Sequence, residues 1–337
     1  MKKIPFLFLI FFLIINFCCQ TSENYYVSGG LKYDQKDYKG ALADFNKAIE
    51  INPKYAEAYN ERGLAKAELL DYQGAIKDYN NAIELIPNNA QIYCNRGLAK
   101  KHLQDYKSAI EDFNKAIEIN PKYAEAYNER GLAKDELLDY QGAIKDYNNA
   151  IELIPTDEDG YYNRALSKYD LQDYQGTMAD LNKAIEINPK DSGAFYSRGL
   201  TKDQLLDYQG AIEDFSKTIE LNPKNAEAYY SRGWAKHNLL DNQGAIEDFS
   251  KTIELNPKNA EAYYSRGFAK YDLLNYRGAI EDFSKTIELN PKNADVYFER
   301  GLAKYQLEQK DSCCLDLNKA GELGYEKAYE MIKEYCK

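Results

Sequence analysis

The side chains that perform most enzyme chemistry are few and scattered in this sequence of 337 residues. Its only two histidines, His102 and His237, lie far apart in the chain. The sequence has no H-E-x-x-H pair, no paired C-x-x-C motifs and no glycine-rich phosphate loop, and it has no recognisable set of Ser, His and Asp. We therefore predict no catalytic residues, no metal site and no cofactor, and we expect that the protein is not an enzyme.

The cysteines are also poorly placed for chemistry. Cys313 and Cys314 could form a metal or redox site, but adjacent residues of a helix point in different directions. Free cysteine packs as a small hydrophobic residue, so we interpret this pair as buried thiols, and Cys94 and Cys336 as thiols too. Six cysteines spaced so unevenly are too few for a disulfide framework.

Carboxylates outnumber basic groups along the chain. The 54 Asp and Glu residues exceed the 43 Lys and Arg residues, which gives a formal net charge of −11. Such a surface repels phosphate backbones, so we expect no nucleic-acid partner. The hydrophobic fraction of 44% is sufficient for a substantial core.

The N-terminal residues predict an export signal. Two lysines precede an apolar run over residues 4–15, and polar residues follow. The run is shorter than the roughly 20 residues of a membrane-spanning helix. The cysteine pair at its end resembles the lipobox of bacterial lipoproteins, in which a cysteine becomes the acylated first residue. Cys19 is the favoured lipidation site and Cys18 the alternative, while an uncleaved anchor and a cleaved signal without lipid stay open.

A proline that recurs every 34 residues organises the rest of the chain. A fixed period of this length indicates stacked structural repeats, each of which packs mainly on its neighbours. The nine repeats are 22–55, 56–89, 90–123, 124–157, 158–191, 192–225, 226–259, 260–293 and a degenerate 294–327. The prolines are Pro53, Pro87, Pro121, Pro155, Pro189, Pro223, Pro257 and Pro291.

The residue spacing in each repeat predicts two helices. In the repeat 56–89, small and aromatic residues recur at spacings of three and four in each half, which predicts one buried stripe per helix. Asp71 between the halves is the expected N-cap of the second helix. In six repeats Asn precedes the proline, and we expect it to close the second helix in the left-handed conformation. Gly63 lies inside the first helix, where glycine costs roughly 1 kcal/mol, which indicates close packing.

These residues resemble the tetratricopeptide repeat. The family pattern has an aromatic residue at position 4, Gly at 8, Ala at 20 and 27, an aromatic residue at 24 and Pro at 32. The chain meets it almost completely over about 23–327, with Tyr in place of the usual Trp at position 4. The resemblance implies an all-α fold: a right-handed α-solenoid of about nine helix-turn-helix repeats plus a C-terminal capping helix. We expect a leader at 1–21, the array at 22–327 and the capping helix at 328–337.

Two charged positions depart from the family pattern. Position 7 is Arg in every repeat after the first, and position 23 is Asp in every repeat. The pair could form a row of anion or ligand sites. We favour the interpretation that each Arg pairs with an Asp in a structural ion ladder.

The family resemblance also implies that positions 2, 5, 9, 12 and 13 of the first helices face a concave groove. In the later repeats these positions combine aromatic rings with acids, and aromatic residues dominate binding hot spots. Trp234 could equally pack between helices as core. The predicted partner-binding residues are Tyr196, Glu227, Tyr230, Trp234, Glu261, Tyr264, Phe268 and Phe298.

Together these features predict a non-catalytic interaction scaffold. We expect it to be exported and lipid-anchored on the periplasmic or surface side of a bacterial envelope. Its acidic, aromatic groove would bind a peptide or protein segment. The alternative is a carbohydrate or cell-wall binding module that stacks sugars on groove Tyr and Trp residues.

Overall fold

The computed structural model describes residues 21–336. This part of the chain contains nineteen helices and no strand. All of the expected leader except residue 21 lies outside the described residues, and so do both candidate lipidation cysteines. None of the helices within 21–336 combines the length and apolarity needed to cross a membrane.

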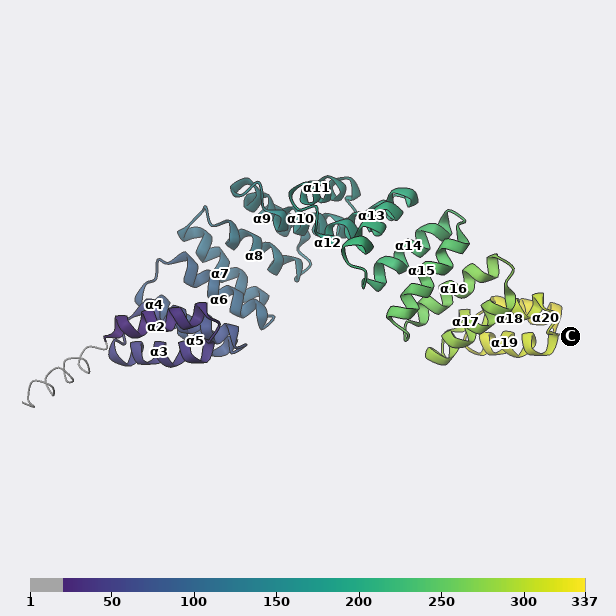
Figure 1. Cartoon of the computed structure of the whole chain (residues 1–337), viewed down its shortest axis with the longest axis horizontal. Coiled ribbons are helices and arrows are strands. Elements are labelled where there is room, and N and C mark those ends of the chain that lie inside the picture. The colour runs from purple at the N-terminus through teal and green to yellow at the C-terminus, as the bar shows by residue number, and fades with distance from the viewer. Residues whose placement is uncertain (1–20, 337) are drawn as a thin grey trace, which may run out of the picture. The chain divides into compact units, whose positions relative to one another are not determined.

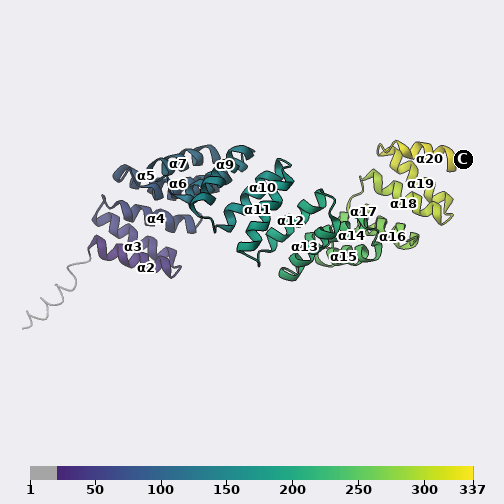
Figure 2. The ribbon, with the colours of Figure 1, turned by 90° about the horizontal axis from the view of Figure 1, so that it is seen from above.

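The helices fall into two compact units, Met1–Leu171 and Gln172–Lys337, and first and second helices of the repeats alternate along each (Figures 1 and 2). The first unit holds α2 (Ser22–Asp34), α3 (Tyr38–Ile51), α4 (Ala56–Glu68), α5 (Tyr72–Leu85), α6 (Ala90–His102), α7 (Tyr106–Ile119), α8 (Ala124–Asp135), α9 (Tyr140–Leu153) and α10 (Glu158–Asp170). The second holds α11 (Tyr174–Ile187), α12 (Ser192–Gln204), α13 (Tyr208–Leu221), α14 (Ala226–Asn238), α15 (Asn242–Leu255), α16 (Ala260–Asp272), α17 (Tyr276–Leu289), α18 (Ala294–Gln306), α19 (Lys310–Glu322) and α20 (Lys327–Tyr335).

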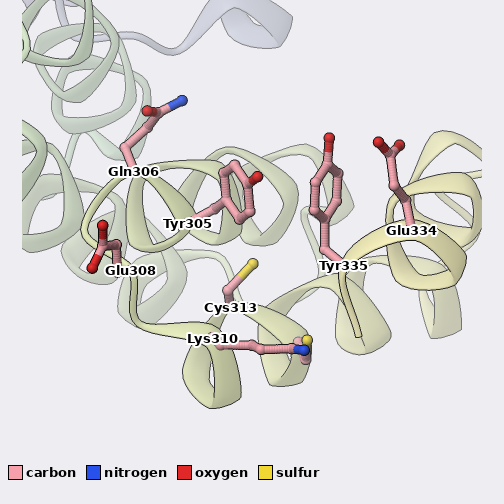
Figure 3. A pocket seen from close by; sticks show the side chains of 8 residues that line it. Tyr305, Gln306, Glu308, Lys310, Cys313, Glu334 and Tyr335 are labelled. Carbon is pink, nitrogen blue, oxygen red and sulfur yellow. The ribbon is translucent and has the colours of Figure 1, made fainter. Parts of the chain in front are cut away.

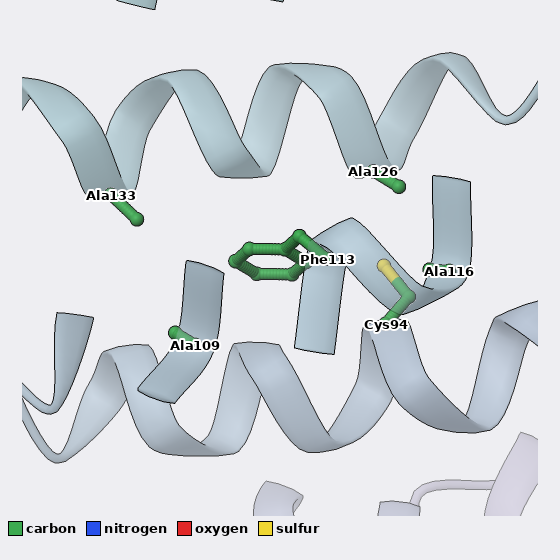
Figure 4. Close-up of a cluster of buried hydrophobic side chains, with 6 residues drawn as sticks. All are labelled: Cys94, Ala109, Phe113, Ala116, Ala126 and Ala133. Atoms are coloured by element: carbon green, nitrogen blue, oxygen red, sulfur yellow. The ribbon is translucent and has the colours of Figure 1, made fainter. Parts of the chain in front are cut away.

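Packing within each unit is between neighbours along the chain. Each helix contacts the next one, and the first helices of successive repeats also touch. Figure 4 shows one of the resulting clusters, in which the ring of Phe113 on α7 lies between Cys94 on α6 and Ala126 and Ala133 on α8. All four side chains are buried. Because every layer is built in this way, the expected all-α solenoid is confirmed.

The glycine at position 8 of the first helix, which Ala165 replaces in the fifth repeat, permits a close helix contact. A Cβ added at Gly63 would lie 2.5 Å from the ring of Tyr79 on the facing second helix. The same clash would occur at Gly131 with Tyr147, at 2.6 Å. The glycine therefore recurs because the large ring at position 24 leaves no room for a side chain, which gives the physical reason for the predicted close packing.

The turns between helices confirm one prediction and correct another. The Asp71 carboxylate accepts a hydrogen bond from the Gly74 backbone N–H and caps α5. The asparagine before the proline is not left-handed: Asn52 has φ −130° and ψ 90°, and its side chain accepts from the Lys54 N–H. The left-handed residue instead follows the first helix, at Leu70 with φ 63° and at the equivalent position of every repeat.

The recurring Arg and Asp form the predicted ion ladder within repeats. Arg62 binds Asp78 through two hydrogen bonds of 2.9 and 2.6 Å, and Lys66 contacts the same carboxylate at 2.7 Å. Asp78 is only 2% exposed, so this is a buried charge held by two cations rather than a surface pair. The bidentate pairs are Arg62–Asp78, Arg96–Asp112, Arg130–Asp146, Arg198–Asp214, Arg232–Asp248, Arg266–Asp282 and Arg300–Asp316.

The same arginines also join each repeat to the one before it. Arg62 donates its third hydrogen bond, of 2.7 Å, to Asn46 on the second helix of the preceding repeat. Its guanidinium lies 5.3 Å from the centre of the Tyr59 ring, within cation–π range. In the later repeats Ser replaces Asn as the acceptor, as in the 3.0 Å bond from Arg232 to Ser216. Each of the three guanidinium nitrogens thus donates one hydrogen bond within the array, which argues against a row of anion sites.

The C-terminal helix covers the apolar side of the last repeat. Ala328, Met331 and Ile332 of α20 pack on a cluster that contains Phe298 and Leu317. Ala328 and Leu317 are fully buried there. This packing removes from solvent the apolar surface that a further repeat would otherwise cover.

Candidate functional site

The first helices of the second unit carry a row of aromatic rings at position 5. Tyr196, Tyr230 and Tyr264 are half-buried, and each packs on the Phe at position 24 of its own repeat, at centroid distances of 5.7, 5.6 and 5.9 Å. The hydroxyl groups of Tyr196 and Tyr230 also lie 3.3 Å from a serine hydroxyl on the next first helix. The rings are therefore fixed in position, with one part left exposed.

Phe298, the last of the predicted position-5 residues, is placed differently. Its side chain is 8% exposed, and its ring lies 4.6 Å from that of Tyr325. The side chain belongs to the cluster beneath α20. Phe298 thus contributes to the end of the array and offers little surface to a partner.

The rings of α14 and α16 form a continuous set that we call the aromatic strip: Tyr230, Trp234, His237, Tyr264 and Phe268. Trp234 meets Tyr230 and His237 edge to face, at 6.5 and 5.3 Å. His237 in turn meets Phe268 at 6.0 Å, and Phe268 lies 6.2 Å from Tyr264. All five are half-buried. Trp234 also packs on the core residue Phe249 at 5.9 Å, so it is both a core and a surface residue.

His237 was not among the predicted site residues. Its Nδ1 lies 2.7 Å from Asn242 Oδ1, and its Nε2 lies 3.8 Å from an Asp272 carboxylate oxygen. The position of His237 three residues after Trp234, on one helix face, is a sequence signal that could have identified it.

Carboxylates border the aromatic strip. Glu227 and Glu261, in the first turns of α14 and α16, are exposed and form no ion pair with any residue in 21–336. Glu299 on α18 is half-buried, and burial together with the charges of Asp295 and Asp272 raises its pKa to about 7. Glu299 occupies position 6, which is Ser in the three preceding repeats, and the sequence reading did not select it.

This arrangement can bind a cation without catalysing a reaction. Ring faces attract ammonium and guanidinium groups, and uncompensated carboxylates strengthen that attraction. The same negative charges hold the nearby tyrosines in their protonated form: burial, followed by the charges of Glu299 and Asp295, raises the pKa of Tyr264 to about 12. Within 21–336 there is no group of three or more His, Cys, Asp or Glu residues arranged to hold a metal ion.

A hollow of about 590 Å³ lies at the C-terminal end of the array (Figure 3). Its walls come from the end of α18, from α19 and from the end of α20. The sulfur of Cys313 points toward the space between the rings of Tyr305 and Tyr335. These rings are 4.5 Å apart.

The cysteines here correct the sequence prediction. Cys314 and Cys336 are not thiols but form a disulfide that ties α19 to the end of α20. Cys313 is a buried thiol, as expected, and burial raises its pKa. Cys94 is also a buried thiol, fully enclosed between α6, α7 and α8. The two bonded residues are 22 positions apart, and only the fold of α20 back onto α19 brings them together.

Comparison with known proteins identifies the family. Models described as tetratricopeptide repeat or TPR repeat match residues 29–69, 71–104, 90–123, 124–157, 158–191, 207–239, 241–273 and 260–293. The chain belongs to the tetratricopeptide repeat family. Proteins of this family are typically non-catalytic interaction scaffolds, and no enzyme family is indicated.

Solved structures of similar fold come from the same family. The C-terminal part of a TPR repeat-containing protein from Cytophaga hutchinsonii is 18% identical with a TM-score of 0.60, over 71% of this chain and 98% of that one. A tetratricopeptide repeat protein from Parabacteroides merdae is 23% identical with a TM-score of 0.54, over 74% and 99%. YrrB, described as a TPR protein with an unusual peptide-binding site, is 22% identical with a TM-score of 0.50, over 56% and 97%. No curated protein sequence matches the chain.

Proposed function

We propose that this protein is a non-catalytic scaffold that binds a basic segment of a partner protein on the first helices of its second unit. The observation that carries the proposal is the aromatic strip bordered by Glu227, Glu261 and Glu299; the first two are exposed and form no ion pair with any residue that the structure describes. Lysine and arginine side chains match both features, because they pair with carboxylates and lie over ring faces. The peptide-binding site described for YrrB is consistent with this use of the fold.

The scaffold is proposed to work outside the cytoplasm, attached to a bacterial membrane through lipid on Cys19 or Cys18. The lysines and apolar run of the leader support export. The Cys314–Cys336 disulfide supports it independently, because disulfides persist in oxidising compartments and are rare in the cytosol. Mass spectrometry of the mature N-terminus tests the anchor: a diacylated cysteine is expected, and an unmodified N-terminus beyond residue 21 would refute it.

A peptide array tests the binding site. The array carries octapeptides of graded net charge, with and without aromatic residues. It is probed with the full mature chain. Basic peptides should bind, their affinity should fall with added salt, and Glu227→Gln with Glu261→Gln should weaken binding about tenfold, as expected for the loss of charge pairs. Glu57→Gln is the matched control, because Glu57 is the exposed position-2 residue of a repeat without the aromatic strip.

The same variants separate the carbohydrate alternative. Sugar stacking would be insensitive to salt and to the two glutamate changes but would be lost in Trp234→Ala. Binding of soluble cell-wall oligosaccharides with that pattern, and no preference for basic peptides, would reject the scaffold proposal in favour of the carbohydrate module.

A further inference from the structure

Two repeats of the first unit are natural single-site variants of each other. Residues 53–87 and 121–155 are identical except that Ala67 in the second repeat corresponds to Asp135 in the fourth. Both residues lie near the end of the first helix of their repeat. Comparison of the two repeats therefore shows which contacts a carboxyl group makes at this position, and which groups lose a partner when it is absent.

In the fourth repeat the carboxyl group serves a buried phenol. Asp135 accepts a hydrogen bond of 2.6 Å from the Tyr147 hydroxyl and one of 2.8 Å from the Ser167 hydroxyl. Tyr147 and Ser167 are 0% and 1% exposed; the Ser167 hydroxyl also lies 3.2 Å from the Asn163 carbonyl oxygen, so it is the Tyr147 hydroxyl that depends on this carboxylate. Burial raises the pKa of Asp135, and the charges of Asp170 and Glu136 raise it further.

In the second repeat the equivalent phenol has no such acceptor among the described residues. Tyr79 is 1% exposed, and no group within residues 21–336 forms a hydrogen bond with its hydroxyl. Within residues 21–336 no fully buried side-chain oxygen or nitrogen lacks a hydrogen-bond partner, so the Tyr79 hydroxyl oxygen is not sealed off but faces the open pocket that Tyr79 lines. The ring is not the reason for keeping tyrosine, because phenylalanine fills the same position in other repeats, for example Phe113 and Phe249. The hydroxyl is thus a hydrogen-bond donor that has no protein acceptor within residues 21–336 and is open to a ligand.

That donor lies at the floor of an open pocket of about 310 Å³ between α4 and α6. Leu64 and Leu98 form apolar walls. The rings of Tyr72 and His102 stack in parallel at 4.7 Å and form a flat wall. The corresponding pocket of the fourth repeat has a similar volume of about 350 Å³. The two pockets differ in that Asp135 lines the second one, where Ala67 lines the first.

The charges around the pocket restrict what can enter. Burial raises the pKa of Tyr79, and the negative charges of Glu61, Asp78 and Glu68 raise it further, so the phenol keeps its proton and donates. Glu68 lines the pocket itself. An anionic ligand would be repelled by these carboxylates, whereas a neutral oxygen acceptor would not.

We infer that this pocket, lined by Leu64, Tyr72, Tyr79, Leu98 and His102, is a binding site for a small uncharged molecule with a flat apolar body and one hydrogen-bond-accepting carbonyl. The ligand oxygen takes the place that Asp135 occupies in the fourth repeat and accepts from the Tyr79 hydroxyl. The site lies in the first unit and is separate from the aromatic strip, so it is independent of the proposed partner-binding function.

Isothermal titration and saturation-transfer NMR of the full mature chain with benzamide, benzoate and benzylamine test the inference. Benzamide should bind most tightly, because it alone combines a flat body with a neutral acceptor. Tyr79→Phe and Ala67→Asp should each weaken benzamide binding about tenfold, the equivalent of one hydrogen bond. Tyr147→Phe removes the matching hydroxyl of the fourth repeat and should leave the affinity unchanged.

Folding does not confound the test, since phenylalanine is native at this position elsewhere in the array and thermal unfolding of each variant is recorded alongside. Equal benzamide affinity for wild type, Tyr79→Phe and Ala67→Asp would overturn the inference. Tighter binding of protonated benzylamine than of benzamide would also overturn it, because the pocket would then recognise positive charge rather than an acceptor.

Discussion

Removal of one buried carboxylate from the ion ladder should destabilise the array far more than loss of a surface pair. In Asp282→Ala, Arg266 and Lys270 lose the acceptor that they contact at 2.7 Å each. Asp282 is 4% exposed, and the side chains of its two partners are 19% and 18% exposed. Two largely desolvated cations would be left facing each other across the gap.

Breaking a buried ion pair by removing one partner costs about 3–5 kcal/mol. Here the guanidinium keeps its 3.0 Å bond to Ser250 on the preceding repeat, so the lower half of that range, about 3–4 kcal/mol, is expected. A triple variant that replaces Arg266, Lys270 and Asp282 by apolar residues of similar size should recover most of the loss, because no uncompensated charge remains.

The assay combines urea unfolding, followed by circular dichroism, with amide exchange in α16 and α17, because repeat arrays need not unfold in one step. Lys251→Ala is the control: its partner Glu254 is 67% exposed, and stability should stay nearly unchanged. If Asp282→Ala were as mild as Lys251→Ala, or if exchange in α16 and α17 were unaltered, the account of the ladder as a structural element would be refuted.

Three further outcomes follow from local geometry. Gly131→Ala should lower stability by about 1–3 kcal/mol, because the new Cβ would lie 2.6 Å from the Tyr147 ring; an unchanged melting temperature would contradict this. Leu240→Gly should raise stability by about 1 kcal/mol in urea unfolding, since Leu240 has φ 64° and is 83% exposed, whereas Leu239→Gly should lower it. Glu299 has its pKa raised to about 7 from 4.5, so the folded state binds a proton that the unfolded state releases. Its contribution to stability is therefore present at acidic pH and lost as the pH rises through about 7; Glu299→Gln should flatten that part of the melting-temperature profile.

Much of the fold could be predicted because it depends on local signals repeated in phase. The proline period predicts the repeats themselves, and the Asp71 cap and the close packing at Gly63 were predicted from one repeat. The Arg–Asp pairing could be predicted for the same reason. The prediction of a left-handed residue at Asn52 was wrong. The left-handed conformation occurs instead in the turn after the first helix, at Leu70.

Features that depend on contacts across repeats, or on one exceptional residue, could not be derived in this way. The bond from Arg62 to Asn46 joins two repeats, although the recurrence of Asn or Ser at position 25 was a usable signal. The Cys314–Cys336 disulfide requires the return of α20 onto α19. The pKa of Glu299 is raised by burial and by the charges of Asp295 on α18 and Asp272 on α16. The pattern within one repeat does not show that these residues lie close together.

The measurement that tests the central claim most directly is amide exchange of the full mature chain with and without a saturating basic octapeptide from the array. The account predicts new protection on α14, α16 and α18, and none on α4 or α8, whose position-5 residues carry no aromatic ring. Protection on α4 and α8 with none on α14 and α16, or no change in exchange despite measured binding, would contradict it.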